Sequence, residues 1–168
     1  MGDAFEKDML LFVFADGAMP FCASFLRKSD TLFDILSESV IGEENMPAGS
    51  ILVYGRNYDN PVSRETVIKI LGLEGYPDFA DRIEDFALFS TLNGEYMEAI
   101  LIRLYRVDDT RTAKLLFERR IEEAVRALTI SRKEGYAKNG FVEIKGNTVA
   151  LYMLPEGCGI VDKVKKRI

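Results

Sequence analysis

The stretch FALFSTLNGEYMEAILIRLY, residues 86–105, decides the fold class. Two β-prone runs, Phe86 to Leu92 and Tyr96 to Tyr105, flank the pair Asn93-Gly94. Because Asn-Gly is favoured where both central positions of a tight turn need positive φ, the stretch predicts an antiparallel hairpin. A β-branched residue would resist that conformation, so we expect Gly94→Val to destabilise the protein by roughly 1–3 kcal/mol.

The second strand of this hairpin is apolar on both faces, which is typical of a central strand that is covered on each side. Arg103 lies on one of these faces, where a charged head needs a partner or an opening to solvent. Since Arg and Tyr are enriched at protein contacts, Arg103 and Tyr105 are our candidate interaction residues. They would lie at the rim of a contact with residues before Gly72 or with another protein chain. The alternative is that Arg103 ends the strand and extends its head to solvent.

The sequence after the hairpin predicts a long helix, a second hairpin and a short helix. The long helix begins at about Arg111, with Asp108-Asp109-Thr110 as its cap, and one side carries an apolar stripe. Gly146-Asn147 joins the second hairpin, whose first strand has one wet face and is expected at an edge. The two strands of this second hairpin are expected from Phe141 to Lys145 and from Thr148 to Leu154. The apolar stripe of the long helix consists of Ala113, Leu116, Phe117, Ile121, Ala124, Val125 and Leu128. The short closing helix is expected to bury Ile160, Val161, Val164 and Ile168.

The sequence before the hairpin predicts a smaller set of alternating strands and helices. Ser29-Asp30-Thr31 and Ser63 are good helix caps, and Gly72 is placed to end the second helix. The expected elements are a buried strand from Met9 to Phe14, a helix from about Leu32 to Val40, a strand from Ser50 to Tyr54, and a helix from Ser63 to Gly72.

The expected fold class is therefore α+β. An antiparallel sheet of about four strands, in the order strand-strand-helix-strand-strand-helix, carries one long helix on a face. A small N-terminal α/β unit, residues 1–76, packs on this sheet unit, residues 77–168, and the two form one cooperative domain. The N-terminal elements are expected to cover the other face of the sheet.

Composition excludes several kinds of chemistry. The chain of 168 residues has 22 basic and 27 acidic side chains and a formal charge of −5, the wrong sign for general attraction to nucleic acid. It has no histidine, which removes His-dependent nucleophiles and His-ligated metals. Cys22 and Cys158 are too few for a disulfide framework and lack Cys-x-x-Cys spacing. We accordingly predict no catalytic, metal-binding or cofactor-binding residue, and an inert Cys158 unless a helix N-terminus lowers its pKa.

No transmembrane segment is visible in the sequence. The apolar run from Met9 to Phe14 is shorter than the roughly 18 residues that a membrane-spanning helix needs. Acidic residues rather than a basic leader precede it. The chain as given is expected to be soluble and cytoplasmic, or envelope-anchored outside the cytoplasm if its native N-terminus was trimmed.

Three quoted stretches carry a resemblance to a known family: ILGLEGYPDFADRIEDFALFST, MEAILIRLYRVDDTRTAKLLFERRIEEAVRAL and GYAKNGFVEIKGNTVALYML. From about Leu32 to Lys165 the chain resembles the bacterial domain-of-unknown-function family four-three-five-eight, found largely in predicted lipoproteins and other envelope-anchored proteins. The resemblance implies a shared fold and an envelope association, and it transfers no catalytic residue. Cys22 lacks the small flanking residues of a lipidation site.

Several polar groups are further site candidates, each with a structural alternative. The paired carboxylates Glu84-Asp85 and Asp108-Asp109 suit acid–base or metal chemistry, but neighbours on a strand point to opposite faces and those at a helix start act as caps. The loop Gly55 to Asn60 suits a ligand but lacks a phosphate-binding pattern, so a simple connector is the alternative. Arg119-Arg120 suits an anion, although consecutive helix residues diverge by about 100°.

These observations favour a non-catalytic binding or protein-interaction module, which acts on another protein or by self-association. The alternative is a small-ligand-binding protein, or a carboxylate-based enzyme, with a cleft between the N-terminal unit and the sheet.

Overall fold

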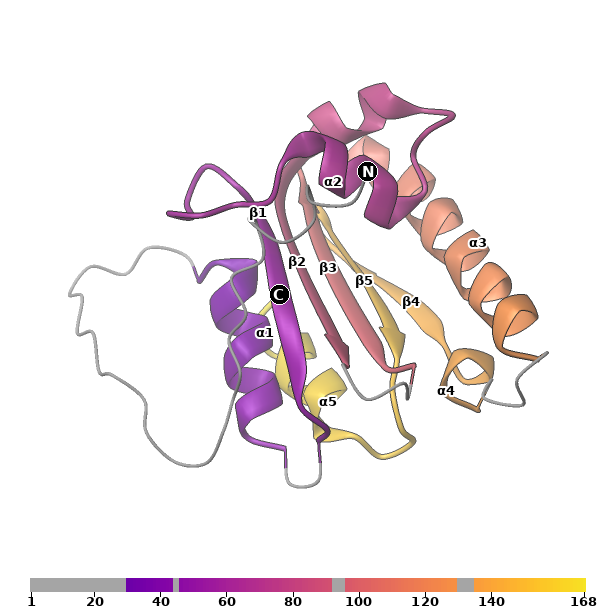
Figure 1. Cartoon of the computed structure of the whole chain (residues 1–168). Helices are drawn as coiled ribbons and strands as arrows, with labels where there is room; N and C mark the ends of the chain where they lie inside the picture. The colour runs from indigo at the N-terminus through magenta and orange to yellow at the C-terminus, as the bar shows by residue number, and fades with distance from the viewer. Residues whose placement is uncertain (1–29, 44–45, 92–95, 130–134) are drawn as a thin grey trace, which may run out of the picture.

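The computed structural model describes residues 30–43, 46–91, 96–129 and 135–168 (Figure 1). The expected strand from Met9 to Phe14, Cys22 and the Asn93-Gly94 turn lie outside these residues. Within the described chain, five strands form one antiparallel sheet in the order β1-β2-β3-β5-β4. Their bounds are β1 (Gly49–Gly55), β2 (Ile83–Thr91), β3 (Glu98–Leu104), β4 (Phe141–Lys145) and β5 (Thr148–Met153).

Helices cover both faces of this sheet. The α-helices are α1 (Leu32–Ile41), α2 (Arg64–Leu71), α3 (Thr110–Thr129), α4 (Gly135–Lys138) and α5 (Gly159–Lys165), and short 3₁₀ helices η1 (Pro77–Arg82) and η2 (Val107–Asp109) precede β2 and α3. The long helix α3 is the one that the sequence predicted. None of the described helices has the length and apolar character needed to cross a bilayer.

The strands β2 and β3 form the predicted hairpin and lie in the middle of the sheet. Phe89 pairs with Ala99 and Ala87 with Leu101, and β3 pairs on its other side with β5. Every residue of β3 except Arg103 is buried. The α+β class, the antiparallel sheet and the central position of this strand are thus confirmed.

The sheet has one strand more than the sequence predicted. The strand expected from Ser50 to Tyr54 is β1, and it pairs along its whole length with β2, from Gly49 opposite Thr91 to Gly55 opposite Asp85. Residues of the expected N-terminal unit therefore extend the same sheet as the hairpin. Local pattern predicted this strand, but its partner depends on a pairing across about thirty residues of chain, which local pattern does not encode.

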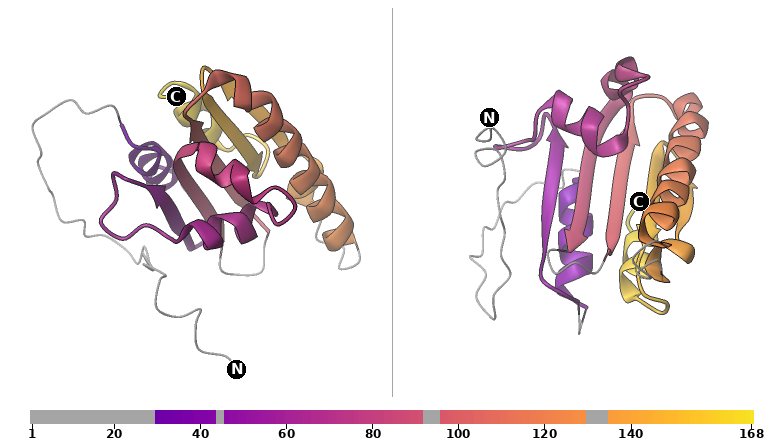
Figure 2. Two further views of the ribbon diagram at one scale, coloured as in Figure 1. Left: turned by 90° about the horizontal axis from the view of Figure 1, so that it is seen from above. Right: turned by 45° about the vertical axis from the view of Figure 1, so that its right-hand side comes forward.

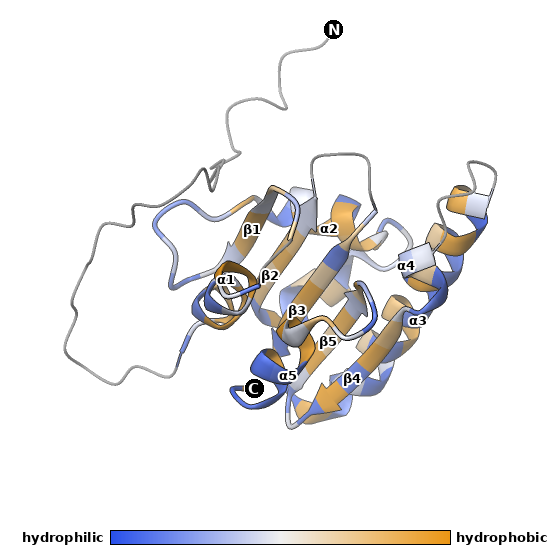
Figure 3. Cartoon of the chain, turned by 90° about the horizontal axis from the view of Figure 1, so that it is seen from below, coloured by the Kyte–Doolittle hydropathy of each residue, from blue (hydrophilic) through white to orange (hydrophobic). Residues whose placement is uncertain are grey.

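Two hydrophobic layers hold the helices on the sheet (Figure 2). One layer packs α2 and α3 against one face, with Phe117 of α3 and Phe86 of β2 fully buried in it. The other packs α1 and α5 against the opposite face, with Leu36 and Val164 at its centre. Hydrophobic residues run along the strands between these layers (Figure 3). Of the N-terminal helices, α1 covers the second face as predicted and α5 completes that cover, whereas α2 packs on the same face as α3, which the sequence did not predict.

The predicted helix ends are largely confirmed. Thr31 and Asp34 form a reciprocal capping box at the start of α1. Ser63 caps α2, and Gly72 ends it in the left-handed conformation at φ 65°. The start of α3 differs from the prediction: the helix follows directly on η2 at Thr110, and the Asp109 carboxylate, expected to cap it, instead accepts a hydrogen bond from Arg82 Nη1 at 2.6 Å.

The second hairpin also follows the sequence. β4 is an edge strand with partly exposed residues, and β5 is buried throughout between β3 and β4. Gly146 has φ 59°, the left-handed conformation that the tight turn needs. In α5, Ile160 and Val164 face the core as predicted.

Candidate functional site

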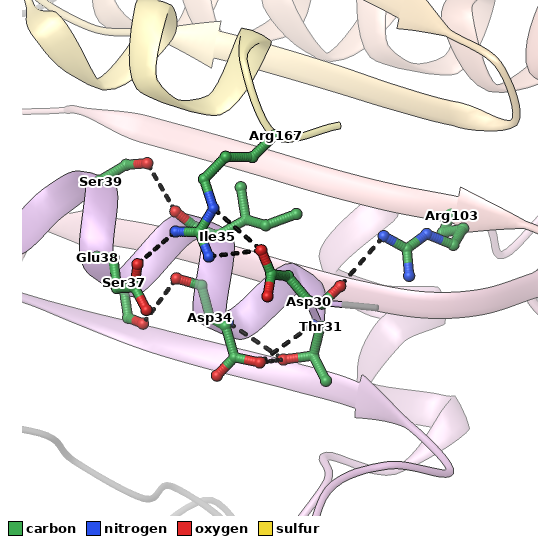
Figure 4. A network of polar contacts seen from close by, with 9 residues as sticks. All are labelled: Asp30, Thr31, Asp34, Ile35, Ser37, Glu38, Ser39, Arg103 and Arg167. Carbon is green, nitrogen blue, oxygen red and sulfur yellow. Dashed lines mark hydrogen bonds and ion pairs between the residues drawn. The ribbon is translucent and has the colours of Figure 1, made fainter. Parts of the chain in front are cut away.

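Arg103, a predicted interaction residue, lies on the α1 side of β3. Its Nη1 is 3.8 Å from Asp85 Oδ2, and its Nη2 donates to the Asp30 carbonyl oxygen at 3.5 Å (Figure 4). The side chain is 22% exposed. It therefore lies at the rim of the contact between β3 and α1, a contact made by residues before Gly72 of the same chain. Binding of another molecule by Arg103 stays a prediction.

Asp85 joins the sheet to the start of α1. It is 3% exposed and accepts hydrogen bonds from the Leu32 N–H at 3.0 Å and from the Tyr58 hydroxyl at 2.5 Å. The Tyr58 oxygen in turn accepts from the Phe33 N–H at 3.3 Å. Burial raises the pKa of the Tyr58 hydroxyl, and its hydrogen bond to Asp85 raises it further. The Asp85 carboxylate thus accepts from the first N–H group of α1 directly and is linked to the second through Tyr58, which is a structural role.

A set of ion pairs joins α1 to α5. Arg167 lies between Asp30 and Glu38 at 2.7 and 2.6 Å, and Figure 4 shows its guanidinium directed at both carboxylates. Lys163 Nζ lies 2.8 Å from Glu43 Oε1. The hydrogen bond from Lys163 and the one from a backbone N–H of α5 lower the pKa of Glu43. These charges hold the two helices together on one face.

The predicted Arg119-Arg120 pair diverges, as expected for consecutive helix residues. Arg119 points to solvent and pairs with Glu123 at 2.7 Å. Arg120 turns inward, where its guanidinium binds both carboxylate oxygens of Glu98 at 2.6 and 2.9 Å and also donates to the Ile70 carbonyl. Burial opposes the charge of Arg120, but the bonds and charge of Glu98 outweigh that effect and raise its pKa. Arg120 therefore ties α3 to β3 and α2.

A cleft among the described residues runs between α3 and the segment around η1. Its volume is about 620 Å³, within the usual range for ligand pockets. Tyr76 and Leu115 stand on its two walls and are 69% and 60% exposed, while Phe79 and Leu116 are more buried. Its remaining lining residues are Gly75, Pro77, Asp78, Arg82, Thr112 and Arg119. We call this cleft the α3 groove.

The charges of the α3 groove lie at its rim. Arg82 is bound to Asp109 at 2.6 Å, and its guanidinium also lies 5.9 Å from the centre of the Phe79 ring. A smaller polar hollow of about 260 Å³ borders the groove, because both are lined by Leu116 and Arg119. The surface as a whole thus has an apolar centre and a charged border.

A second cleft contains the other predicted interaction residue, Tyr105. It has a volume of about 360 Å³ and lies where β1 and β3 end and β2 begins. We call it the Tyr105 cleft, and its lining residues are Tyr54, Gly55, Arg56, Pro61, Asp81, Ile83, Glu84 and Tyr105. It therefore brings together three sequence candidates: Tyr105, the start of the Gly55 to Asn60 loop, and Glu84. It also lies between the expected N-terminal unit and the sheet.

A β-bulge separates the paired carboxylates Glu84-Asp85. In the ladder with β3, Ile83 pairs with Leu104 and Asp85 with Arg103, which leaves Glu84 as the extra residue. Glu84 is exposed at the Tyr105 cleft, whereas Asp85 is buried under α1. The two carboxylates thus have separate surroundings, one exposed and one buried, and do not form a paired site.

Among the described residues, no group of three His, Cys, Asp or Glu side chains is arranged to hold a metal ion. Cys158 is half-buried at the start of α5, with its Sγ 4.0 Å from Glu43 Oε2. Burial raises the pKa of this thiol, the opposite of the lowering by which a helix N-terminus activates a cysteine.

The α3 groove was missed by the sequence reasoning, although two signals could have found it. Leu115 is an apolar residue outside the predicted stripe of α3, and Tyr76 stands in the turn-forming run Gly75-Tyr76-Pro77. Comparisons of the chain with protein-family models, with curated proteins and with solved structures give no match.

Proposed function

We propose that the protein is a non-catalytic interaction module that binds an apolar segment of a partner polypeptide in the α3 groove. The observation that carries this proposal is the pair Tyr76 and Leu115, which face solvent on the two walls of one groove. Full burial of a Leu or aromatic side chain contributes roughly 1.5–3 kcal/mol. Most of that gain is still available here to a partner.

The shape of the groove supports a short, inserted segment. The half-buried Leu116 and the buried Phe79 supply an apolar floor, and the charged side chains stand outside it. Binding energy in protein interfaces concentrates in such partly enclosed apolar centres with polar rims. Arg82 and Arg119 are already paired with Asp109 and Glu123, so the border of the groove offers a partner little free charge and the apolar centre carries the recognition.

The buried carboxylates of the chain support a scaffold rather than an acid–base catalyst. Asp85, Glu98 and Asp109 are each bound by named partners that join one structural element to another. A catalytic carboxylate needs an oxygen directed at a substrate. The alternative of a small-ligand site is favoured by one observation, the Tyr105 cleft, and is developed below.

The test is selection of peptides from a random displayed library on the folded chain. We expect enriched peptides that share one or two aromatic or aliphatic residues at fixed positions. Leu115→Asp should weaken their binding at least tenfold, because it places a charge on the groove wall. The matched control is Ile41→Asp, since Ile41 is 46% exposed on α1, away from the groove.

Two results would overturn this proposal. One is a library without enriched peptides, or with peptides that bind Leu115→Asp as tightly as the parent. The other is a parent chain that forms a dimer by light scattering and becomes a monomer with Leu115→Asp, because the occupant would then be a second copy. The envelope association that the family resemblance implies is a separate proposal, and fractionation of the native host cells tests it.

A further inference from the structure

We propose that the Tyr105 cleft binds a small zwitterion, an amino-carboxylate of about the size of one amino acid. Its ammonium group would pair with Glu84, its carboxylate with Arg56, and its body would lie against Tyr54 and Tyr105. This inference is independent of the α3 groove, because none of these residues lines that groove.

The cleft forms where three strands reach the same end of the sheet (Figure 1). Gly55 ends β1 at φ 142°, a conformation that other residues rarely adopt. A Cβ atom at Gly55 would lie only 3.0 Å from the Glu84 carbonyl oxygen. The sheet therefore brings the loop after β1 close against the bulge of β2, and both contribute to the cleft.

The charges of this cleft are the decisive observation. Asp81 is already neutralised, because Arg64 binds both of its oxygens at 2.6 and 2.7 Å. In the described part of the chain, the side chains of Arg56 and Glu84 have no ion-pair or hydrogen-bond partner, and they do not pair with each other. One free cation and one free anion thus line the same cleft, which is the arrangement that a zwitterion complements.

The walls and the size of the cleft narrow the class of ligand. Tyr54 and Tyr105 offer aromatic faces and hydroxyl groups, and Tyr105 is 53% exposed, so burial by a ligand is still possible. A volume of about 360 Å³ lies near the lower limit for ligand pockets, about 300 Å³. A single amino acid suits that space better than a nucleotide or a folded peptide.

The experiment measures binding of a panel of free L-amino acids to the full chain by calorimetry, with two blocked analogues of the best member. The amino acid amide lacks the carboxylate, and the N-acetyl amino acid lacks the ammonium group. Glu84→Gln should weaken binding of the free amino acid and of the amide at least tenfold and leave binding of the N-acetyl analogue unchanged. Arg56→Gln should weaken binding of the free amino acid and of the N-acetyl analogue at least tenfold and leave binding of the amide unchanged.

The control is Asp59→Asn, which removes a charge from the same exposed loop without altering the lining of the cleft. Its affinity for the free amino acid should equal that of the parent. The proposal is overturned if no amino acid binds below millimolar concentration, or if Glu84→Gln and Arg56→Gln weaken all three ligands alike. Loss of peptide binding in Leu115→Asp with intact amino acid binding would show that the two sites are separate, whereas amino acid binding by a chain that enriches no peptide would leave this proposal standing alone.

Discussion

Replacing Asp85 with alanine should destabilise the protein more than any other removal of a single carboxylate. The change takes away the acceptor for the Leu32 N–H, in a buried hydrogen bond, and for the Tyr58 hydroxyl, in a partly buried one. A buried donor that is left without a partner costs about 1–3 kcal/mol. Arg103 lies farther away at 3.8 Å, so its loss adds less than about 1 kcal/mol.

The expected loss is therefore about 3–5 kcal/mol, a large part of the 5–15 kcal/mol that typically separates native from unfolded protein. Urea unfolding followed by circular dichroism measures it. With an m-value near 2 kcal/mol/M, the midpoint should fall by about 1.5–2.5 M. If Asp85→Ala does not fold, Asp85→Asn is measured instead, because it keeps one acceptor oxygen and should lose about half as much.

Glu84→Ala is the matched control, since it removes the neighbouring carboxylate from an exposed position. Its effect should stay within about 0.5 kcal/mol. Tyr58→Phe removes only the hydroxyl, and a double-mutant cycle with Asp85→Ala should show coupling, because the two side chains share one hydrogen bond. An Asp85→Ala midpoint as high as that of Glu84→Ala would refute the assigned role of Asp85 at the start of α1.

Three further predictions concern charged and sulfur-containing side chains. Glu98→Ala should destabilise by about 2–4 kcal/mol in urea unfolding, because it leaves the largely buried Arg120 guanidinium without its carboxylate. Glu43 has a lowered pKa in the folded protein, so its stabilising contribution is present above its unfolded pKa of about 4.3 and is lost as the pH falls through the lower folded value. Unfolding free energies at several acidic pH values should consequently depend less on pH in Glu43→Gln. The double variant Cys22→Ser, Cys158→Ser should melt at the same temperature as the parent chain under oxidising conditions, and a loss of stability relative to the parent that is confined to oxidising conditions would reveal a disulfide.

The fold was predictable where the cause is local. Thr31, Ser63 and Gly72 act on their own helix ends, and the sequence around each is enough to place those ends. The apolar faces of β3 likewise predict a covered strand without knowledge of what covers it. The pairing of β1 with β2 was not predictable in this way, because a strand contains no local signal for its neighbour.

The candidate sites were predictable only in part. Tyr105 and Glu84 were each chosen from the sequence, but their common cleft depends on the ends of three strands and on a bulge. Arg103 and Tyr105 were expected together at one rim, and the structure separates their surroundings: Arg103 lies against α1, and Tyr105 follows the end of the sheet and faces the cleft. Residues two apart share a face only while the strand continues.

Both clefts use η1 as a wall, although no residue lines both of them. Phe79 and Arg82 line the α3 groove, whereas Asp81, from the same short helix, lines the Tyr105 cleft. Arg64 holds η1 in place through Asp81 and through the carbonyl oxygen of Pro77 at 2.9 Å. The side chain of Arg64 thus helps to hold the wall between the two clefts, together with the buried Phe79 and Ala80 of η1, which anchor that wall in one hydrophobic layer of the sheet.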